Sequence, residues 1–260
     1  MGKTVAIVNQ KGGVGKTTTA VNLVAAIGAK GFKVLLVDSD PQGNSTSGLG
    51  INKRQLDFST YDVLINSKPA SEATIKTNFE NVWLVPSSMN LAGAELELVD
   101  IDKRETKLKN ALAMVKNDYD FIFIDCPPSL GLITLNSLCA ADSIMVPIQC
   151  EYYALEGLSQ LMSTVRQVKR LYNPLIEIEG VLLTMYDGRL NLTQQVVDEV
   201  KRFFPKKVYS TFIPRNVRLS EAPSYGQPVM YYDRNSKGSS AYEGLCNEFL
   251  DSNEIKVGVI

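Results

Sequence analysis

A short glycine-rich segment stands between an apolar, β-branched run and a helix-like segment, and this arrangement leaves few possible folds. Residues 4–9 read TVAIVN, which is typical of a buried parallel strand. The segment QKGGVGKTT follows at residues 10–18, and helical periodicity runs from Thr17 to about Ala29 and stops at Gly31. A strand, a glycine-rich turn and a helix in this order favour an α/β fold with an anion site at the helix N-terminus.

The same alternation continues along the chain. Further strands are predicted at residues 33–40, 119–128, 141–149, 177–187 and 207–214, and further helices at 153–171, 191–204 and 239–251. Residues 42–52 are expected to form a loop, and residues 57–118 short helices around 81–87. Strands that alternate with helices indicate βαβ units. We therefore predict one α/β domain over residues 1–260, with a single doubly wound, mostly parallel sheet flanked by helices.

Composition excludes several chemistries. The 260 residues include no His, and the four Cys form no C-x-x-C pair, so a Zn site is disfavoured and His-based catalysis is excluded. The scattered, mostly apolar-flanked Cys suggest a reducing compartment. No signal peptide and no apolar run near the ~20 residues of a membrane span are visible, which predicts a cytoplasmic protein without membrane contact. Net charge is −1, so nucleic-acid binding would need a local basic patch.

The glycine-rich segment fits a phosphate-binding loop that has one lysine more than usual. The ordinary pattern is G-x-x-x-x-G-K-[ST], and Gly15, Lys16 and Thr17 match its end. Its first glycine would fall at position 10, which is Gln, and Lys11 comes next. Lys16 is expected to neutralise the β- and γ-phosphates, and the Thr17 hydroxyl to ligate Mg²⁺.

Acidic residues end two of the predicted strands. Asp125 ends the apolar run FIFID, the usual place of a carboxylate that holds Mg²⁺ beside a phosphate loop. Asp38 and Asp40 end the strand at 33–40, and one of them could orient an attacking water. Asp38 also stands where a dinucleotide fold would hold a ribose, but the G-x-G-x-x-G pattern begun at Gly13 would need glycine at position 18, which is threonine. A nucleoside triphosphate therefore fits better than a dinucleotide.

Five stretches together resemble the ParA/Soj-type chromosome- and plasmid-partitioning ATPases. The stretch KGGVGKT (11–17) resembles the deviant Walker A motif, and DSDPQGN (38–44) and IDCPPS (124–129) resemble the second and third motifs of that family. The stretches LLTMYDGRLNL (182–192) and IPRNVRLSEAPSYGQP (213–228) extend the resemblance from Lys3 to about Leu250. The resemblance implies a P-loop NTPase fold, ATP hydrolysis, and ATP and Mg²⁺ as cofactors.

The resemblance also implies a role for the second lysine. In this family two ATP molecules lie between two protomers, and the signature lysine, here Lys11, contacts the phosphates held by the other subunit. A further cation suits a triphosphate buried between subunits, because the buried charge must be compensated. Lys16 and Thr17 would act within their own subunit, Asp125 would support Mg²⁺ together with Thr17, and Asp40 would position the hydrolytic water. The implied ATP-binding residues are Lys11, Gly12, Gly13, Val14, Gly15, Lys16, Thr17, Thr18, Met185, Pro214, Arg215 and Asn216.

Residues 163–218 are more basic than the rest of the chain. They include ten Lys and Arg against five Asp and Glu. Such an excess can bind phosphates without reading bases, although charge alone fits solvated helix faces as well. The resemblance implies that an ATP-bound homodimer binds double-stranded DNA without sequence preference, with Arg189 and Arg218 in the motifs that carry this. It also implies association with the nucleoid and a ParB/Spo0J-type centromere-binding partner that stimulates hydrolysis.

Three related ATPase classes are alternatives. A MinD-like ATPase of a membrane-linked positioning system needs a basic amphipathic C-terminal helix, but the tail SNEIKVGVI (252–260) has one Lys and one Glu. An iron–sulfur ATPase like the nitrogenase iron protein would use Cys126 and Cys139 of two subunits. A bacterial tyrosine kinase of the same group needs a C-terminal tyrosine cluster, and here only Tyr231 and Tyr232 are adjacent.

Overall fold

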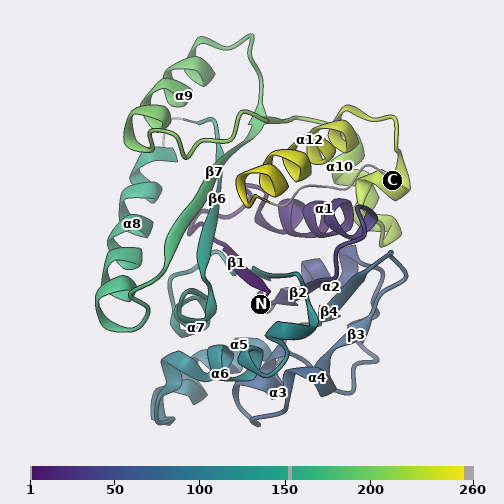
Figure 1. Ribbon diagram of the computed structural model, residues 1–260, viewed down its shortest axis with the longest axis vertical. Helices are drawn as coiled ribbons and strands as arrows, with labels where there is room; N and C mark the ends of the chain where they lie inside the picture. The colour runs from purple at the N-terminus through teal and green to yellow at the C-terminus, as the bar shows by residue number, and fades with distance from the viewer. Residues whose placement is uncertain (1, 152–153, 255–260) are drawn as a thin grey trace.

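The computed structural model describes residues 2–151 and 154–254, except for the side chains of residues 154–156. Within these residues eight strands form one sheet in the order β3-β4-β2-β5-β1-β6-β7-β8, and every neighbouring pair is parallel except β3 with β4 (Figure 1). The strands are β1 (Lys3–Ile7), β2 (Val34–Asp38), β3 (Ile75–Lys76), β4 (Val82–Val85), β5 (Phe121–Asp125), β6 (Ser143–Gln149), β7 (Glu177–Tyr186) and β8 (Ile213–Pro214). The predicted α/β class with a mostly parallel sheet is confirmed; the single-domain boundary stays a prediction.

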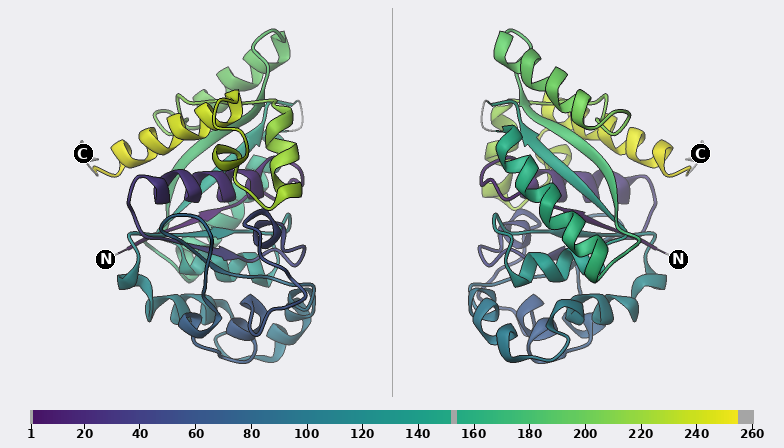
Figure 2. Two further views of the ribbon diagram at one scale, coloured as in Figure 1. Left: turned by 90° about the vertical axis from the view of Figure 1, so that its right-hand side faces the viewer. Right: turned by 90° about the vertical axis from the view of Figure 1, so that its left-hand side faces the viewer.

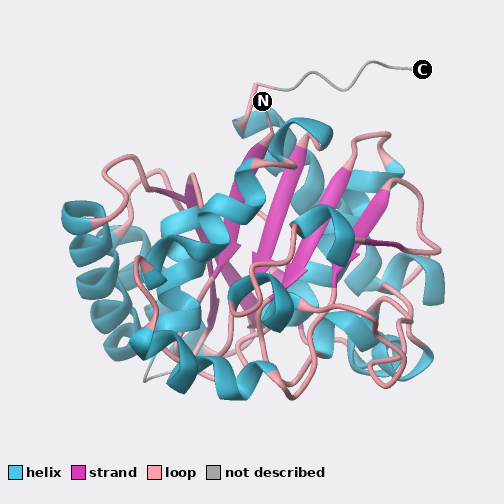
Figure 3. Ribbon diagram, turned by 90° about the horizontal axis from the view of Figure 1, so that it is seen from below, coloured by secondary structure: helices cyan, strands magenta, loops and turns pink. Residues whose placement is uncertain are grey.

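The helices connect these strands and cover both faces of the sheet. They are α1 (Lys16–Ala29), α2 (Asn44–Gly48), α3 (Thr60–Leu64), α4 (Ala70–Ala73), α5 (Leu91–Glu97), α6 (Lys107–Ala113), α7 (Leu132–Ala140), α8 (Ala154–Leu171), α9 (Asn191–Phe203), α10 (Val217–Glu221), α11 (Val229–Tyr232) and α12 (Lys237–Ser252). Figure 3 shows the strands lying between helices on either side. Among the described helices, none is long and apolar enough to cross a membrane.

Alternating side chains of each central strand build two cores. In β5, Phe121 and Phe123 pack on the face that α1 and α12 cover, whereas Ile122 and Ile124 pack on the opposite face. Helix α12 runs beside α1 in every view (Figures 1 and 2). Because both of their faces are buried, the central strands β2 and β5 are apolar up to the aspartate that ends each of them, as the sequence predicts.

Two predicted segments differ from the structure. Of the strand predicted at 207–214, only Ile213–Pro214 belongs to the sheet, with one isolated bridge from Val208 to Val181. This is an edge strand with a single neighbour, so fewer backbone hydrogen bonds stabilise a long strand there. The expected loop at 42–52 contains α2, although Asn, Ser, Thr and Gly are poor helix formers. Its hydroxyls bond to two buried carboxylates, and this tertiary contact outweighs local propensity.

The strand order indicates a binding site at the carboxyl ends of the central strands. From β1 the chain passes to β2 on one side, and after β5 it crosses to β6 on the other side. Parallel pairing sets Asp38 of β2 opposite Asp125 of β5, and Asp125 opposite Ile7 of β1. Open α/β sheets bind ligands at the carboxyl ends of strands where the order reverses. The glycine-rich loop after β1 begins at this point.

Candidate functional site

The glycine-rich loop joins the carboxyl end of β1 to the first turn of α1. Gly13 (φ 74°) and Gly15 (φ 89°) have left-handed backbone, which residues with a side chain rarely adopt. Gly15 is the N-cap of α1, and no side chain caps the helix there. The free N–H groups and the positive end of the helix dipole are therefore available to an anion. Gly12 and Gly13 are exposed, whereas Val14 is buried.

Lys16 lies almost fully buried at the start of α1. Lys16 is 6% exposed, and its Nζ donates a hydrogen bond to the Lys11 carbonyl oxygen at 3.1 Å. Burial lowers the pKa of Lys16, and the nearby Asp125 and Asp40 carboxylates partly oppose this. An ammonium with three donors and one bond to a neutral carbonyl is poorly satisfied, and phosphate oxygens would complete its environment.

Asp125 and Asp38 lie side by side and fully buried. Ser45 Oγ donates to Asp125 Oδ2 at 2.7 Å, whereas Asp125 Oδ1 has no hydrogen-bond partner in the described part of the chain. Burial raises the pKa of Asp125 to about 6, although the Ser45 and Thr17 hydroxyls oppose this. An orphaned carboxylate oxygen beside the Thr17 hydroxyl is a hard-oxygen donor set, which fits Mg²⁺.

Asp38 and Asp40 have different surroundings. Asp38 Oδ2 accepts from Thr46 N at 2.8 Å and from Thr46 Oγ1 at 2.7 Å, and burial, followed by repulsion from Asp125, raises the pKa of Asp38 to about 7. Asp40 is 7% exposed and accepts at Oδ1 from Gln42 N at 2.9 Å. Its own N–H donates to Asp38 Oδ1 at 3.2 Å. Asp38 therefore anchors the turn that carries Asp40.

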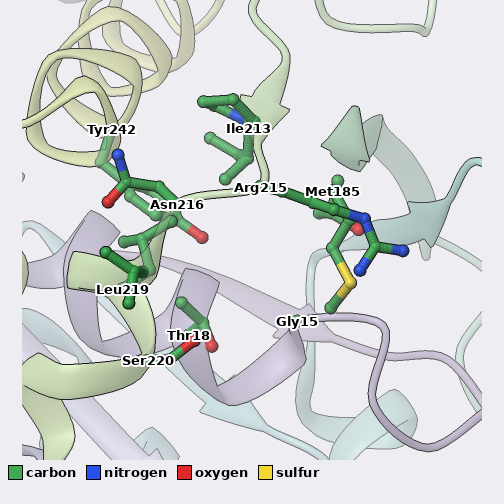
Figure 4. A pocket seen from close by; sticks show the side chains of 12 residues that line it. Gly15, Thr18, Met185, Ile213, Arg215, Asn216, Leu219, Ser220 and Tyr242 are labelled. Atoms are coloured by element: carbon green, nitrogen blue, oxygen red, sulfur yellow. The ribbon is translucent and has the colours of Figure 1, made fainter. Parts of the chain in front are cut away.

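A pocket of about 340 Å³ opens beside the loop. Figure 4 shows Gly15 and Thr18 of the loop and α1 on one side and the segment from Ile213 to Asn216 on another. Met185 has φ 51° at a register shift between Thr184 and Tyr186, a bulge that redirects its side chain. Six of the predicted ATP-binding residues line this pocket: Gly15, Thr18, Met185, Pro214, Arg215 and Asn216.

The second lysine, Lys11, is held outside that pocket. Its Nζ lies 3.0 Å from Glu151 Oε2, and its side chain is 34% exposed. Its backbone N–H donates to Asn9 Oδ1 at 3.0 Å. Arg215, at the pocket, lies 3.8 Å from the other oxygen of Glu151. One carboxylate therefore faces both the extra lysine of the loop and an arginine of the pocket.

The two arginines predicted to bind DNA are not among the residues that line the pocket. Arg189, between β7 and α9, has an 88% exposed side chain, and its guanidinium bonds to Asp187 at 2.6 and 2.8 Å. Arg218, in α10, bonds to Glu221 at 2.7 Å and to Asp233 at 3.1 Å. Both cations are thus paired with acids of their own chain in this structure.

Sequence reasoning missed several residues of the site. Ser45, Glu151 and Thr184 were not predicted, yet they contact Asp125, Lys11 and the loop respectively. The polar run GNSTS after the second strand could have indicated Ser45 as a ligand-side hydroxyl. No local pattern indicates Glu151, because it lies 140 residues from Lys11 in the chain.

The cysteines do not form a metal site in the described residues. All four are buried, and burial raises the pKa of both Cys126 and Cys139 to about 12. Within residues 2–151 and 154–254 no three His, Cys, Asp or Glu residues gather into a site that could hold a metal ion by themselves.

Known proteins are similar to this chain in sequence and in fold. Residues 2–178 match the family described as "AAA domain". The sporulation initiation inhibitor protein Soj of Bacillus subtilis is 57% identical over 248 residues, which cover 95% of this chain and 98% of that protein. The chromosome partitioning protein ParA of Myxococcus xanthus is 51% identical over 250 residues, which cover 96% of this chain and 88% of that protein.

Two solved structures have the same architecture. Cobyrinic acid a,c-diamide synthase from Mycobacterium smegmatis, with bound ADP and magnesium, superposes with a TM-score of 0.85 and 38% identity, over 98% of this chain and 96% of that one. The cell division ATPase MinD of Pyrococcus furiosus gives 0.79 and 28%, over 96% and 99%. The sequence argument against a MinD-like protein concerns residues 252–260, of which 255–260 lie outside the described residues.

The loop geometry, the buried Lys16 and the two strand-end carboxylates define the class of this protein, a P-loop ATPase. Within that class, the chain belongs to the ParA/Soj family of partitioning ATPases. The prediction drawn from the five sequence motifs is confirmed. This membership favours the partitioning class over the iron–sulfur and tyrosine-kinase alternatives.

Proposed function

We propose that this ATPase binds Mg²⁺-ATP at the pocket beside the loop and acts as a nucleotide switch for DNA segregation. In the ATP state two protomers form a sandwich dimer that binds double-stranded DNA without sequence preference on the nucleoid in the cytoplasm. A ParB/Spo0J-type partner stimulates hydrolysis, and the dimer then separates and releases the DNA. The similarity to Soj and ParA supports this role.

The proposed nucleotide site uses residues of one protomer for most contacts. Phosphates lie against the N–H groups from Gly12 to Thr18, and the Lys16 ammonium supplies their nearest cation. The base lies in the pocket beside Met185, Pro214 and Asn216. Thr17 and Asp125 would hold Mg²⁺, which neutralises the phosphate charge that develops during transfer. Asp40 orients the attacking water, since its turn is fixed by Asp38.

The observation that carries the proposal is the different placement of two lysines from one loop. Lys16 is buried against the loop, whereas Lys11 is partly exposed and does not line the pocket of its own protomer. A cation in this position can reach a phosphate held by a second protomer. Within one protomer Glu151 pairs with Lys11, and Lys11 would leave this pair to contact a second protomer.

The first prediction separates the two lysines. Lys16→Ala should lose ATP binding, because the phosphates lose their cation within the protomer. Lys11→Ala should keep ATP binding but fail to dimerise, because its charge acts across the interface. Titration with a fluorescent ATP analogue measures binding, and light scattering with ATP measures dimerisation. A Lys11→Ala protein that dimerises like the wild type would refute the action in trans.

A further inference from the structure

The hydroxyl of Thr184 forms a hydrogen bond that connects the phosphate loop to the sheet. Thr184 lies in β7 and is 2% exposed, and its Oγ1 donates a hydrogen bond to the Val14 carbonyl oxygen at 2.8 Å. Val14 is 1% exposed, so water does not compete for this bond. The two residues are 170 positions apart in the chain.

Burying a hydroxyl at position 184 costs free energy unless the hydroxyl has a hydrogen-bond partner. Residues Val181, Leu182 and Leu183 precede it in the strand and are fully buried and apolar. Valine has nearly the same shape as threonine and would suit such a strand, whereas a hydroxyl in an apolar interior costs free energy unless it is hydrogen-bonded. The Val14 carbonyl is the acceptor that satisfies it.

The bond fixes the orientation of one peptide group of the loop. In a trans peptide the C=O and the following N–H point in opposite directions. When Thr184 holds the Val14 carbonyl toward β7, the N–H of Gly15 must point away from β7, toward the side where the phosphates are proposed to lie. Gly15 also packs against Thr184, because a Cβ built on this glycine would lie 3.6 Å from the threonine methyl.

The same strand segment also shapes the other end of the pocket. Thr184 and Met185 both line it, and the bulge that gives Met185 a φ of 51° begins at Thr184. We propose that Thr184 is a positioning residue, which fixes the phosphate loop relative to the base side of the pocket. The proposal rests on the proposed nucleotide site, and it adds a residue that touches the loop instead of the nucleotide phosphates.

Two substitutions distinguish the effect of the hydroxyl from the effect of the side-chain volume. Thr184→Val keeps the shape and removes the donor, which leaves the buried Val14 carbonyl unpaired and free to rotate. An unmade buried hydrogen bond corresponds to roughly 5- to 100-fold in an equilibrium constant. We expect ATP and ADP to bind more weakly by about this factor, with a raised KM and a kcat within about twofold of wild type, because the bond acts equally on ground and transition states. Thr184→Ser keeps the donor and should bind both nucleotides almost normally.

A matched control tests whether any lost threonine hydroxyl has this effect. Thr134 in α7 is fully buried, and its Oγ1 donates to the Ser129 carbonyl at 2.7 Å. Thr134→Val should lower the thermal stability without changing nucleotide affinity. If Thr184→Val does not fold, Thr184→Ala beside Thr184→Ser makes the same comparison.

The outcomes are distinct. Equal nucleotide affinity of the Ser variant and of the variant without a hydroxyl would overturn the positioning role, as would a Thr184→Val protein with wild-type KM. A Lys16→Ala protein that binds ATP normally would instead refute the nucleotide site itself. Isothermal titration with ATP and with ADP, together with steady-state hydrolysis, measures all of these quantities.

Discussion

At the scale of single residues, the site contains pairs of residues that carry the same charge but have different surroundings. Lys11 and Lys16 carry the same group, yet only Lys16 is buried, and only Lys11 has an ion-pair partner among the described residues. Asp38 and Asp40 also differ in their surroundings, since Asp38 accepts hydrogen bonds from Thr46 and from the Asp40 N–H. The hydrogen bonds of Asp38 anchor the turn that carries Asp40, whereas Lys16 keeps donors for a phosphate and Lys11 must leave its partner Glu151 to act.

The ion pair between Lys11 and Glu151 should oppose dimerisation. Lys11 must leave Glu151 to reach the phosphates of a second protomer, so Glu151→Gln should lower the ATP concentration needed for half-dimerisation. Partly exposed pairs contribute about 0.2–1 kcal/mol, which corresponds to roughly 1.5- to 5-fold. Light scattering across an ATP titration measures the shift, with Glu105→Gln as a control of equal charge. A Glu151→Gln protein that needs more ATP would instead give Glu151 a direct role in the dimer.

Asp40 should affect hydrolysis and not binding. Asp40→Ala removes the carboxylate proposed to orient water, so kcat should fall by roughly 10²-fold or more, and the protein should accumulate as an ATP-bound dimer. Single-turnover hydrolysis and ATP titration separate the two steps. Wild-type hydrolysis by Asp40→Ala would move the role to another group, with Asp38 the next candidate.

At the scale of elements, one carboxylate joins three parts of the fold. Glu179 of β7 bonds to Lys3 of β1 at 2.5 Å, to Ser143 of β6 at 2.6 Å and to Asn253, just after α12, at 2.8 Å. Its side chain is 5% exposed. Burial opposes the ionisation of Glu179, but the three donors outweigh it, so the pKa of Glu179 is lowered. Helix α12 is thereby fastened to the amino ends of the central strands.

This lowered pKa predicts the direction of a pH dependence. Because the folded state holds the proton of Glu179 less tightly than the unfolded state, the group stabilises the fold above its ordinary pKa near 4.5, and this is lost as pH falls through the lower folded value. Glu179→Gln should lower the free energy of unfolding by about 1–3 kcal/mol at pH 7. The difference should shrink below pH 4.5, as measured by urea unfolding. Glu177→Gln, on the exposed part of β7, is the control; a constant difference at every pH would contradict the ionic role.

At the scale of the whole molecule, the proposed switch links a nucleotide pocket to basic residues elsewhere. Arg218 lies between Val217 and Leu219 of the pocket lining, and Arg189 lies just beyond the end of β7, which carries Met185. Both arginines therefore lie a few residues from the pocket along the chain. Their acidic partners are partly exposed, and pairs of this kind are weak, so a DNA phosphate can replace them. Dimerisation would double the phosphate contacts.

DNA binding should depend on these arginines, on nucleotide and on salt. Arg189→Glu and Arg218→Glu should each weaken binding to unrelated long duplexes sharply while ATP-dependent dimerisation persists. Lys109→Glu on α6 makes the same change in net charge outside residues 163–218 and should have little effect. Affinity should fall steeply with salt, as counterion release requires. The measurement is a salt titration with a non-hydrolysed ATP analogue; a flat response, or equal binding without nucleotide, would contradict the proposed switch.

Local patterns in the sequence were sufficient to predict the central strands and the phosphate loop. Buried parallel strands are recognisable because both of their faces need apolar side chains, and the loop after β1 is recognisable because glycines and Lys16 meet a helix N-terminus. The motif resemblance added the family. The short helix α2 was missed, because its formation depends on Ser45 and Thr46 bonding to Asp125 and Asp38, and nothing in the propensity of those residues favours a helix.

The sequence by itself determined the class of fold, the phosphate loop and the family, since each depends on residues that are close together in the chain. The tertiary structure alone decided which side chains meet across it: Glu151 with Lys11, Thr184 with Val14, and Glu179 with Lys3. Those pairs depend on the strand order, which brings β6 beside β1 and β7 beside β6. Residues more than a hundred positions apart leave no local periodicity, and only the folded sheet brings them within bonding distance.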